Sequence, residues 1–343
     1  MKRFIIFRAD RLGDFLIISN IIKKIKLKYL DSHITIVCSP LNEKLVKNYS
    51  IVNKVIVYNR ASSIFEKFLV IKKICKYNYY ASLALDGKTF SHLANVLLKS
   101  RYKYGISYKF NLVKCLNIYW SKPNYIYNKF FFNHYLFFTS KNFLKKAEHL
   151  PTLFIKLVSK LNLNLKKKDP YYFEVKKKDK LEYLKLYDNK IKGNFFLINL
   201  DEKWNDIKDI NYNLFSEISL LQRRLKKKII ITTYKNNFAY YKNLKKKVKE
   251  NKHIIFFENL RLGLFERLIS HSSISISCHS GFLVQIAGFN KTTLIDIINK
   301  KDYVWYSSWK PLNTKHKFVF KSDFKKNSLK YIFNRIIIES KKF

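Results

Sequence analysis

Short apolar segments alternate with longer amphipathic ones along most of the chain. The first apolar segment, residues 4–7, ends in the polar turn Arg8-Ala9-Asp10-Arg11-Leu12-Gly13-Asp14, and an apolar pattern of helical spacing follows over 15–29. A run of four to eight apolar residues that ends in a polar turn is typical of a buried parallel strand. The opening stretch therefore predicts a strand, a tight turn and a helix.

The same alternation recurs in both halves of the sequence. In the first half it predicts strands over 4–7, 33–38, 54–58, 80–85 and 102–106, and helices over 15–29, 64–77 and 90–98. In the second half it predicts strands over 194–200, 228–233, 254–257, 273–277 and 292–298, and helices over 214–225, 238–248, 262–270 and 281–289. Strands that alternate with helices imply mainly parallel sheets with helices on both faces.

Charge runs mark the best boundary between the halves. One run ends at Pro170 and the next spans 176–180, and polar, proline-containing stretches are typical linkers. Residues 107–142 fit no simple period, whereas 143–165 regain a helical one. Two α/β units usually leave a cleft, a favoured ligand site. We expect an N-terminal domain, a second domain and a last helix that packs back across the linker, over residues 1–170, 171–324 and 325–343.

Charge narrows the class of partner. The 343 residues carry a formal net charge of +44, which favours nucleic acid, phosphorylated sugars or an acidic membrane surface as partners. Genome composition is a second explanation of the positive charge, because residues with AT-rich codons are in excess and lysines occur along the whole length of the chain. No zinc, helix-turn-helix or RNA-recognition signature is visible, so we expect no nucleic-acid partner.

Several sequence features predict the compartment. Arg8, Asp10 and Arg11 interrupt the first apolar run too early for a signal peptide, and no run of about 18 uncharged apolar residues occurs. The segment 130–138 is aromatic and predicts core or, less favoured, an interfacial patch. Widely spaced cysteines fit a reducing compartment; they are Cys38, Cys75, Cys115 and Cys278. We expect a cytoplasmic protein, peripherally attached to the inner face of the cytoplasmic membrane.

Polar residues that follow the expected strands are the candidate ligand groups, because doubly wound folds bind ligands at that edge. Asp14 follows the first strand and is open to two interpretations, a helix cap or a functional carboxylate. Asp86 ends the fourth strand, where it can bind a substrate hydroxyl. Lys203 is either a point charge for phosphate or a solvated loop residue. Thr232 and Thr233 end the next strand.

The turn His279-Ser280-Gly281 joins an expected strand to an apolar helix. Ser280 can cap that helix, and Gly281 lets the backbone approach a ligand closely. The N–H groups and dipole of a helix N-terminus suit a diphosphate. The alternative is a routine turn with a satisfied histidine. Walker A and G-x-G-x-x-G patterns are absent, which weighs against ordinary NTPase or dinucleotide binding, and the G-x-S-x-G nucleophile elbow is absent too. No D-x-D pattern is present to hold a metal ion, so we expect neither a metal nor a cofactor.

These stretches together resemble glycosyltransferase family 9, the heptosyltransferase-like enzymes of bacterial lipopolysaccharide synthesis. The K-W turn of that family is matched by Lys203 and Trp204, and a Leu/Glu segment by Leu264 and Glu266. Its D-[ST]-G-x-x-H-x-A segment is similar to 279–286, with His279, Phe282 and Val284 in place of Asp, Pro and His. Its opening pattern I-I-x-R-x-x-x-L-G-D is matched by Ile5, Ile6, Arg8, Leu12, Gly13 and Asp14.

The resemblance implies a GT-B fold, in which two Rossmann-like domains face a cleft. It also implies an inverting, metal-independent transfer of a heptose-like sugar from a nucleotide-diphospho-sugar to a lipopolysaccharide or oligosaccharide acceptor. The alternative is an inactive transferase-fold protein that only binds a sugar nucleotide or an envelope partner. With the strand-end residues, we expect Asp14 as catalytic base, Arg8, Arg11, Gly13 and Asp86 at the acceptor, and Lys203, Trp204, Thr232, Thr233, His279, Ser280 and Gly281 at the donor. Arg8 and Arg11 have a second expected role, which is to hold Asp14 in place.

Overall fold

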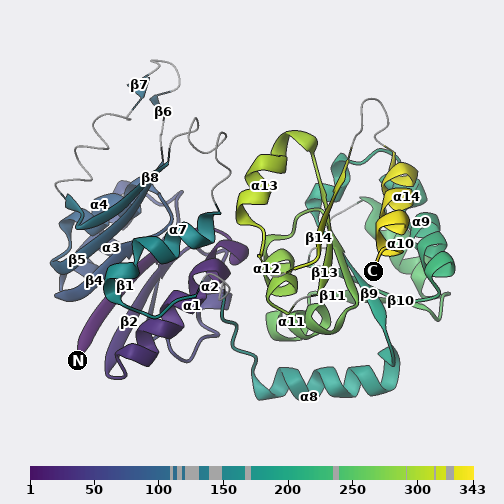
Figure 1. The fold of residues 1–343 in the computed structure, drawn as a ribbon, viewed down its shortest axis with the longest axis horizontal. Coiled ribbons are helices and arrows are strands. Elements are labelled where there is room, and N and C mark those ends of the chain that lie inside the picture. Colours follow the sequence, from purple (N-terminus) through teal and green to yellow (C-terminus); the bar gives the residue numbers. More distant parts are fainter. Residues whose placement is uncertain are drawn as a thin grey trace. The chain divides into compact units, whose positions relative to one another are not determined.

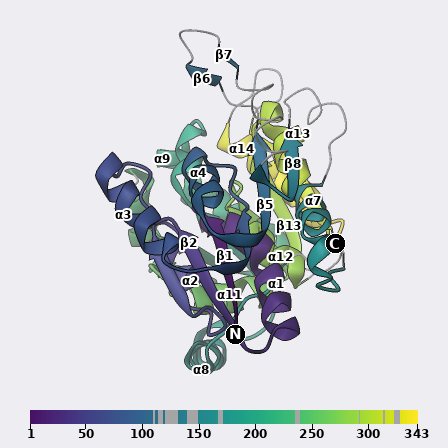
Figure 2. The same cartoon turned by 90° about the vertical axis from the view of Figure 1, so that its left-hand side faces the viewer.

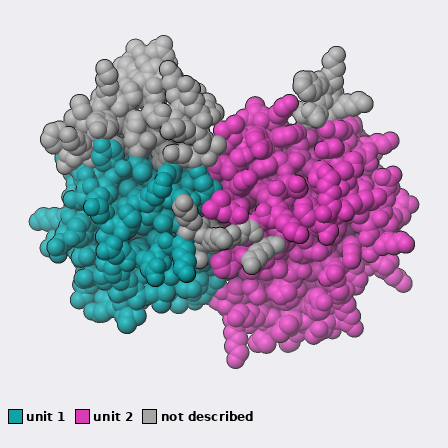
Figure 3. Space-filling view, in the orientation of Figure 1, with its two compact units in different colours: residues 1–174 teal, residues 175–343 magenta. Residues whose placement is uncertain are grey.

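The computed structural model of the chain divides into two compact units, Met1–Glu174 and Val175–Phe343, which are coloured separately in Figure 3. Each unit contains one six-stranded parallel sheet. The structure describes residues 1–108, 111–113, 118–119, 131–138, 149–166, 171–234, 239–290, 292–312, 314–321 and 328–343.

The sheet of unit 1 has the strand order β3-β2-β1-β4-β5-β8. The central strand β1 has buried residues from Phe4 to Arg8, as expected for a strand covered on both faces. A separate two-stranded antiparallel pair consists of β6 (Asn111–Val113) and β7 (Ile118–Tyr119). The strands of the main sheet are β1 (Lys2–Arg8), β2 (Ser32–Cys38), β3 (Lys54–Val57), β4 (Tyr79–Ala84), β5 (Ser100–Tyr108) and β8 (His134–Phe138).

Helices cover both faces of this sheet (Figures 1 and 2). Side chains alternate between the faces of a strand, so Ile5 and Phe7 pack with Ile74 and Ala94, under α3 and α4. Helices α1 and α7 contact each other on the opposite face. The helices of unit 1 are α1 (Leu12–Lys28), α2 (Glu43–Val46), α3 (Ile64–Cys75), α4 (Thr89–Leu97), α7 (Leu150–Leu157) and the 3-10 turn η1 (Ser159–Leu161).

The sheet of unit 2 repeats this topology, with the order β11-β10-β9-β12-β13-β14. If the strands of each sheet are numbered as they follow one another in the chain, their order across the sheet is 3-2-1-4-5-6, which is the order of a Rossmann fold. Ligands of such sheets bind at the carboxyl ends of the central strands. The strands are β9 (Phe195–Leu200), β10 (Lys228–Thr233), β11 (Ile254–Glu258), β12 (Ile274–Ser277), β13 (Thr293–Ile298) and β14 (His316–Phe320).

The core of unit 2 lies between this sheet and the helices α9, α10 and α14, while α11 and α12 contact each other and α11 contacts α8. The larger helices are α8 (Lys177–Leu186), α9 (Ile210–Leu225), α10 (Ala239–Val248), α11 (Leu262–His271), α12 (Gly281–Phe289), α13 (Tyr303–Trp309) and α14 (Leu329–Ser340). Shorter turns are η2 (Tyr187–Ile191), η3 (Glu202–Asp206) and η4 (Lys300–Asp302).

The expected strands all appear, and the structure adds one strand to each six-stranded sheet, besides the separate pair β6 and β7. β8 lies inside the segment 107–142 that fits no simple period, and it makes His134–Phe138, the larger part of the aromatic segment 130–138, a strand of the sheet; residue 130 lies outside the described residues. Phe132 is 4% exposed and lies beside His92, so it belongs to the core. β14 is the second added strand. The last helix, expected over 325–343, is α14, which packs against α9 within unit 2. The helical stretch expected over 143–165 is α7 and η1 in its described part.

Candidate functional site

The turn after β1 holds Asp14 at the third position of α1. Arg11 is the N-cap residue of this helix, and the Oδ2 of Asp14 accepts a hydrogen bond from the Arg11 backbone N–H at 3.1 Å. The carboxylate therefore satisfies one terminal amide. Its side chain is nevertheless 34% exposed. The structure is thus compatible with both interpretations of Asp14, a helix cap and a functional carboxylate.

Arg8 is buried beneath this turn, with a side chain only 1% exposed. Its Nε donates to the backbone oxygen of Asp14 at 3.0 Å, and its Nη1 donates to the backbone oxygen of Leu85. The guanidinium also lies 3.5 Å from Asp10 Oδ2 and 3.7 Å from Asp14 Oδ1. These contacts fit the role of holding Asp14 in place. Arg11 is exposed, and Gly13 is buried in the first turn of α1.

Asp86 follows β4 and faces the same turn, but it is only 4% exposed. Its carboxylate accepts hydrogen bonds from the N–H of Ala9 at 3.0 Å, the N–H of Lys88 at 3.0 Å and the hydroxyl of Ser91 at 2.7 Å. Burial raises the pKa of Asp86, and the charge of Asp10 adds to the shift. Asp86 therefore braces the turn from inside, and its contact with a substrate hydroxyl stays a prediction.

Two further residues at this edge were not identified as site residues from the sequence. Asp10 is 14% exposed and pairs with Lys88, whose Nζ lies 3.1 Å from Asp10 Oδ1. Ser39, in the loop after β2, donates its hydroxyl proton to the Asp10 backbone oxygen at 2.6 Å. Both residues follow expected strands, which is a signal that could have found them. The edge thus combines carboxylates at the surface with a buried guanidinium beneath them.

In unit 2 the turn after β9 positions Lys203. Asp201 caps the short helix η3 by accepting the Lys203 N–H at 3.1 Å. Trp204 is fully buried, and its indole N–H donates to the Asn199 backbone oxygen at 3.0 Å. Trp204 thus lies in the core and anchors the turn. Lys321 also supports this turn, because its Nζ donates to the backbone oxygen of Lys203.

The ammonium of Lys203 reaches the turn between β12 and α12. Its Nζ donates to the backbone oxygen of His279 at 2.7 Å. The structure thus brings together two stretches that are 76 residues apart in the chain. Thr232 and Thr233 end the neighbouring strand but are 2% and 4% exposed, and the Thr232 hydroxyl donates to Asn199 Oδ1 at 3.1 Å. These threonines support the edge from within.

His279 adopts a left-handed backbone conformation, with φ of +54°, which is uncommon for residues other than glycine. Its Nδ1 lies 2.6 Å from Oδ2 of the fully buried Asp296, and its ring stacks on Tyr306 with centroids 3.6 Å apart. Asp296 also has His316 Nε2 at 3.5 Å. Burial alone would raise the pKa of Asp296, but the charges and hydrogen bonds of the two histidines outweigh it and lower that pKa.

The sequence analysis did not identify the residues that surround His279. Asp296 and His316 lie on β13 and β14, and Tyr306 lies on α13. Asp296 lies inside an apolar strand, and no sequence motif connects it with the turn at His279. A buried carboxylate and an aromatic ring thus fix the orientation of this histidine, and its role at the donor stays a prediction.

Helix α12 begins at Gly281, immediately after this turn. Ser280 occupies the N-cap position, but its hydroxyl makes no capping hydrogen bond, and its own N–H donates to Ser277 Oγ at 3.2 Å. The N–H groups in the first turn of a helix have no acceptor within the helix, and together with the dipole they favour an anion. Phe282 and Val284 are buried in the core. Lys203, His279 and the α12 N-terminus thus form one electropositive edge.

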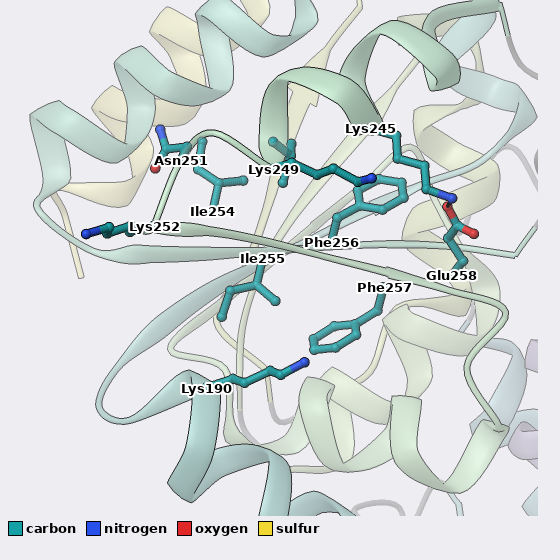
Figure 4. Close-up of a pocket in the computed structure, with 11 residues that line it drawn as sticks. Lys190, Lys245, Lys249, Asn251, Lys252, Ile254, Ile255, Phe256, Phe257 and Glu258 are labelled. Carbon is teal, nitrogen blue, oxygen red and sulfur yellow. Dashed lines mark ion pairs between the residues drawn. The ribbon is translucent and has the colours of Figure 1, made fainter.

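A hollow of about 700 Å³ lies elsewhere on unit 2, at the edge strand β11 (Figure 4). Its lining includes Lys190, Lys249, Lys252 and the ion pair between Lys245 Nζ and Glu258 Oε1, which are 2.8 Å apart. It contains none of the expected site residues. Among the described residues, no group of three or more His, Cys, Asp or Glu side chains is arranged to hold a metal ion, and no helix is long and apolar enough to cross a membrane.

Comparison with solved structures identifies the fold. A glycosyl transferase family 9 structure from Veillonella parvula DSM 2008 superposes with a TM-score of 0.71 at 13% sequence identity, over 99% of this chain and 96% of that one. The ADP-heptose lps heptosyltransferase II of E. coli gives 0.66 at 12% identity, over 100% and 98%. The chain has the GT-B fold.

This GT-B fold is shared with other enzymes. The UDP-GlcNAc 2-epimerase from Methanocaldococcus jannaschii gives a TM-score of 0.55 at 15% identity, over the whole of both chains. By sequence, no protein family model and no curated protein matches. At these identities the likeness is one of fold, so the activity has to be argued from the residues.

Proposed function

We propose that this protein is an inverting, metal-independent glycosyltransferase. In this proposal it moves a heptose-like sugar from a nucleotide-diphospho-sugar onto a lipopolysaccharide or oligosaccharide acceptor of the cell envelope. The observation that carries the proposal is the pair of sheet edges: a partly exposed carboxylate, Asp14, in unit 1, and the electropositive edge of Lys203, His279 and α12 in unit 2. The fold likeness to heptosyltransferase II supports it.

The proposed reaction is a single displacement. The acceptor hydroxyl oxygen attacks the anomeric carbon as the bond from that carbon to the diphosphate oxygen breaks, which inverts the configuration. The hydroxyl proton passes to Asp14, and the electron pair leaves with the nucleoside diphosphate. A positioned general base contributes typically ~10²–10⁴-fold to such a step. Arg8, fixed beneath the turn, holds Asp14 in place through the hydrogen bond to its backbone oxygen and the ion pair with its carboxylate.

The leaving diphosphate develops negative charge, which donors aimed at it stabilise. Lys203 supplies a point charge, and the first turn of α12 supplies backbone N–H groups. His279, held by Asp296, supplies a ring nitrogen of fixed direction. His279 replaces the Asp of the family pattern, so the donor sugar is to be found by experiment rather than assumed.

The test is a binding screen followed by a turnover assay. Nucleoside diphosphates and nucleotide-diphospho-sugars should raise the melting temperature, because a ligand at 100 times its Kd stabilises the folded state by ~2.7 kcal/mol. The donor that binds should release its nucleoside diphosphate only when an acceptor glycan is present. Absence of binding by every nucleotide would overturn the proposal, and binding without transfer would support the inactive alternative.

A further inference from the structure

Helix α3 leaves most of its apolar side chains exposed. Ile74 is the fully buried residue of this twelve-residue helix, whereas Ile64, Phe65, Phe68 and Leu69 are 87%, 66%, 58% and 46% exposed. These positions are adjacent on one side of a helix. Large exposed apolar patches are rare on monomeric soluble proteins and mark a partner or a membrane.

Helix α4, the neighbour of α3, adds two exposed leucines. It packs beside α3 (Figure 2), with Cys75 Sγ 3.8 Å from the Leu97 backbone oxygen. Leu93 and Leu97, one turn apart, are 49% and 52% exposed. We call the six residues Ile64, Phe65, Phe68, Leu69, Leu93 and Leu97 the α3/α4 face.

The exposure of this face does not come from a poorly formed helix. Ser63 and Glu66 form a complete capping box: the Ser63 hydroxyl accepts the Glu66 N–H at 3.2 Å, and Glu66 Oε2 accepts the Ser63 N–H at 2.8 Å. Val70, Ile71 and Cys75 pack on the core with Ile74. The inner side of α3 thus secures the helix, and the outer side carries apolar residues that the fold does not use.

Charge identifies the partner that fits the α3/α4 face. Residues 60–76 contain a single acidic side chain, Glu66, which is engaged in the capping box. Lys72 and Lys73 are exposed and follow the apolar turns of α3 along its outer side. Protein–protein interfaces are depleted of lysine, whereas apolar residues beside lysines suit an anionic bilayer. The basic residues of this stretch are Arg60, Lys67, Lys72, Lys73 and Lys76.

We propose that the α3/α4 face docks the protein onto an anionic lipid surface, with the phenylalanine rings at the boundary between headgroups and acyl chains and the lysines on lipid phosphates. The apolar end of α3 follows β3, so it lies at the carboxyl edge of the unit 1 sheet, the edge that also carries Asp14. A docked α3 therefore brings that edge to the membrane. The docking itself does not depend on the proposed transferase activity.

The test is co-sedimentation of the full chain with phosphatidylglycerol-containing vesicles at about 0.15 M salt, where long-range adhesion by scattered lysines is screened. The Phe65→Ser/Phe68→Ser variant should partition at least ~10-fold more weakly, since burial of one phenylalanine alone is worth about that factor. Leu181→Ser/Leu184→Ser is the matched control, because these α8 leucines are 50% and 54% exposed beside lysines. It should bind like the wild type, and both variants should keep the wild-type melting temperature.

Other results would overturn the proposal. Equal partitioning of the wild type and both variants would mean that the lysines alone adhere to lipid. Sedimentation velocity supplies a second outcome: a wild-type dimer that Phe65→Ser/Phe68→Ser dissociates, without vesicle binding, would assign the face to a second copy of the chain. The assay contains no sugar donor, so its failure leaves the transferase proposal untouched.

Discussion

Asp201, next to Lys203, is a carboxyl group whose surroundings oppose its charge. Burial raises the pKa of Asp201 to about 6, although the charge of Lys203 opposes the shift. An ordinary aspartate has a pKa of about 3.9. The folded state therefore binds this proton more tightly than the unfolded state does. The contribution of protonated Asp201 to the free energy of unfolding is therefore fully present below about pH 4 and is lost as the pH rises through about 6.

Asp201→Asn should remove this dependence. Asparagine still accepts the Lys203 N–H, since Asn and Asp cap about equally well. Unlike aspartate, it does not become a buried negative charge as the pH rises. The variant should exceed the wild type in free energy of unfolding by about 1–3 kcal/mol above pH 6 and match it near pH 4. Urea denaturation from pH 4 to 8 measures the difference, with the exposed Asp188→Asn as control. A pH-independent difference would contradict the assignment.

The residues of the candidate site differ in how far the sequence could predict them. Chain direction places every residue that follows a strand at the carboxyl edge, so Asp14, Lys203 and His279 were identifiable. The direction of a side chain depends on tertiary packing, so the sequence could not tell that Trp204 and Asp86 point inward. Asp296, 17 residues beyond His279, lies within an apolar strand and carries no local signal.

At the scale of elements, the N-terminus of α12 is the proposed anion site, and Ser280 is its N-cap residue. Ser280→Asp should keep or raise the melting temperature, because aspartate is a good cap and favours a helix N-terminus. The same carboxylate should repel a diphosphate and weaken nucleoside diphosphate affinity at least ~10-fold, a cost of ~1.4 kcal/mol. Isothermal calorimetry measures the affinity.

The neutral Ser280→Asn variant is the matched control, because asparagine has the same shape as aspartate and also caps a helix. It should bind the nucleotide with nearly wild-type affinity. Equal affinities for Ser280→Asp and Ser280→Asn would place the diphosphate away from α12.

Elements, too, were predictable to different degrees. Strands such as β9 and β10 are continuous apolar runs and were plain in the sequence. β14, with the sequence HKFVF, is only partly buried at the edge of its sheet, so its apolar signal is short. Helix α8 begins at Lys177, inside a charge run expected to be a linker, because only Asp179 and Tyr183 of this helix are buried. Burial in the tertiary structure, not local pattern, decides such elements.

At the scale of the whole molecule, the proposed site supplies its own positive charge. In the proposed mechanism, Lys203 and the α12 dipole supply the positive charge that a metal ion would otherwise bring to the leaving diphosphate. Turnover should therefore be unchanged by EDTA. Steady-state rates with and without chelator test this. Activity that EDTA abolishes and Mg²⁺ or Mn²⁺ restores would contradict metal independence.

The central claim is that unit 1 carries the base and unit 2 binds the donor, and Asp14→Asn tests it most directly. Asparagine keeps the shape and still accepts the Arg11 N–H, but it cannot take the acceptor's proton. The decisive measurement is kcat for this variant, with donor Kd and melting temperature as companions. The account predicts a fall in kcat of at least ~10²-fold, with donor affinity and stability unchanged. An Asp14→Asn enzyme with wild-type kcat would contradict it and leave Asp14 as a helix cap alone.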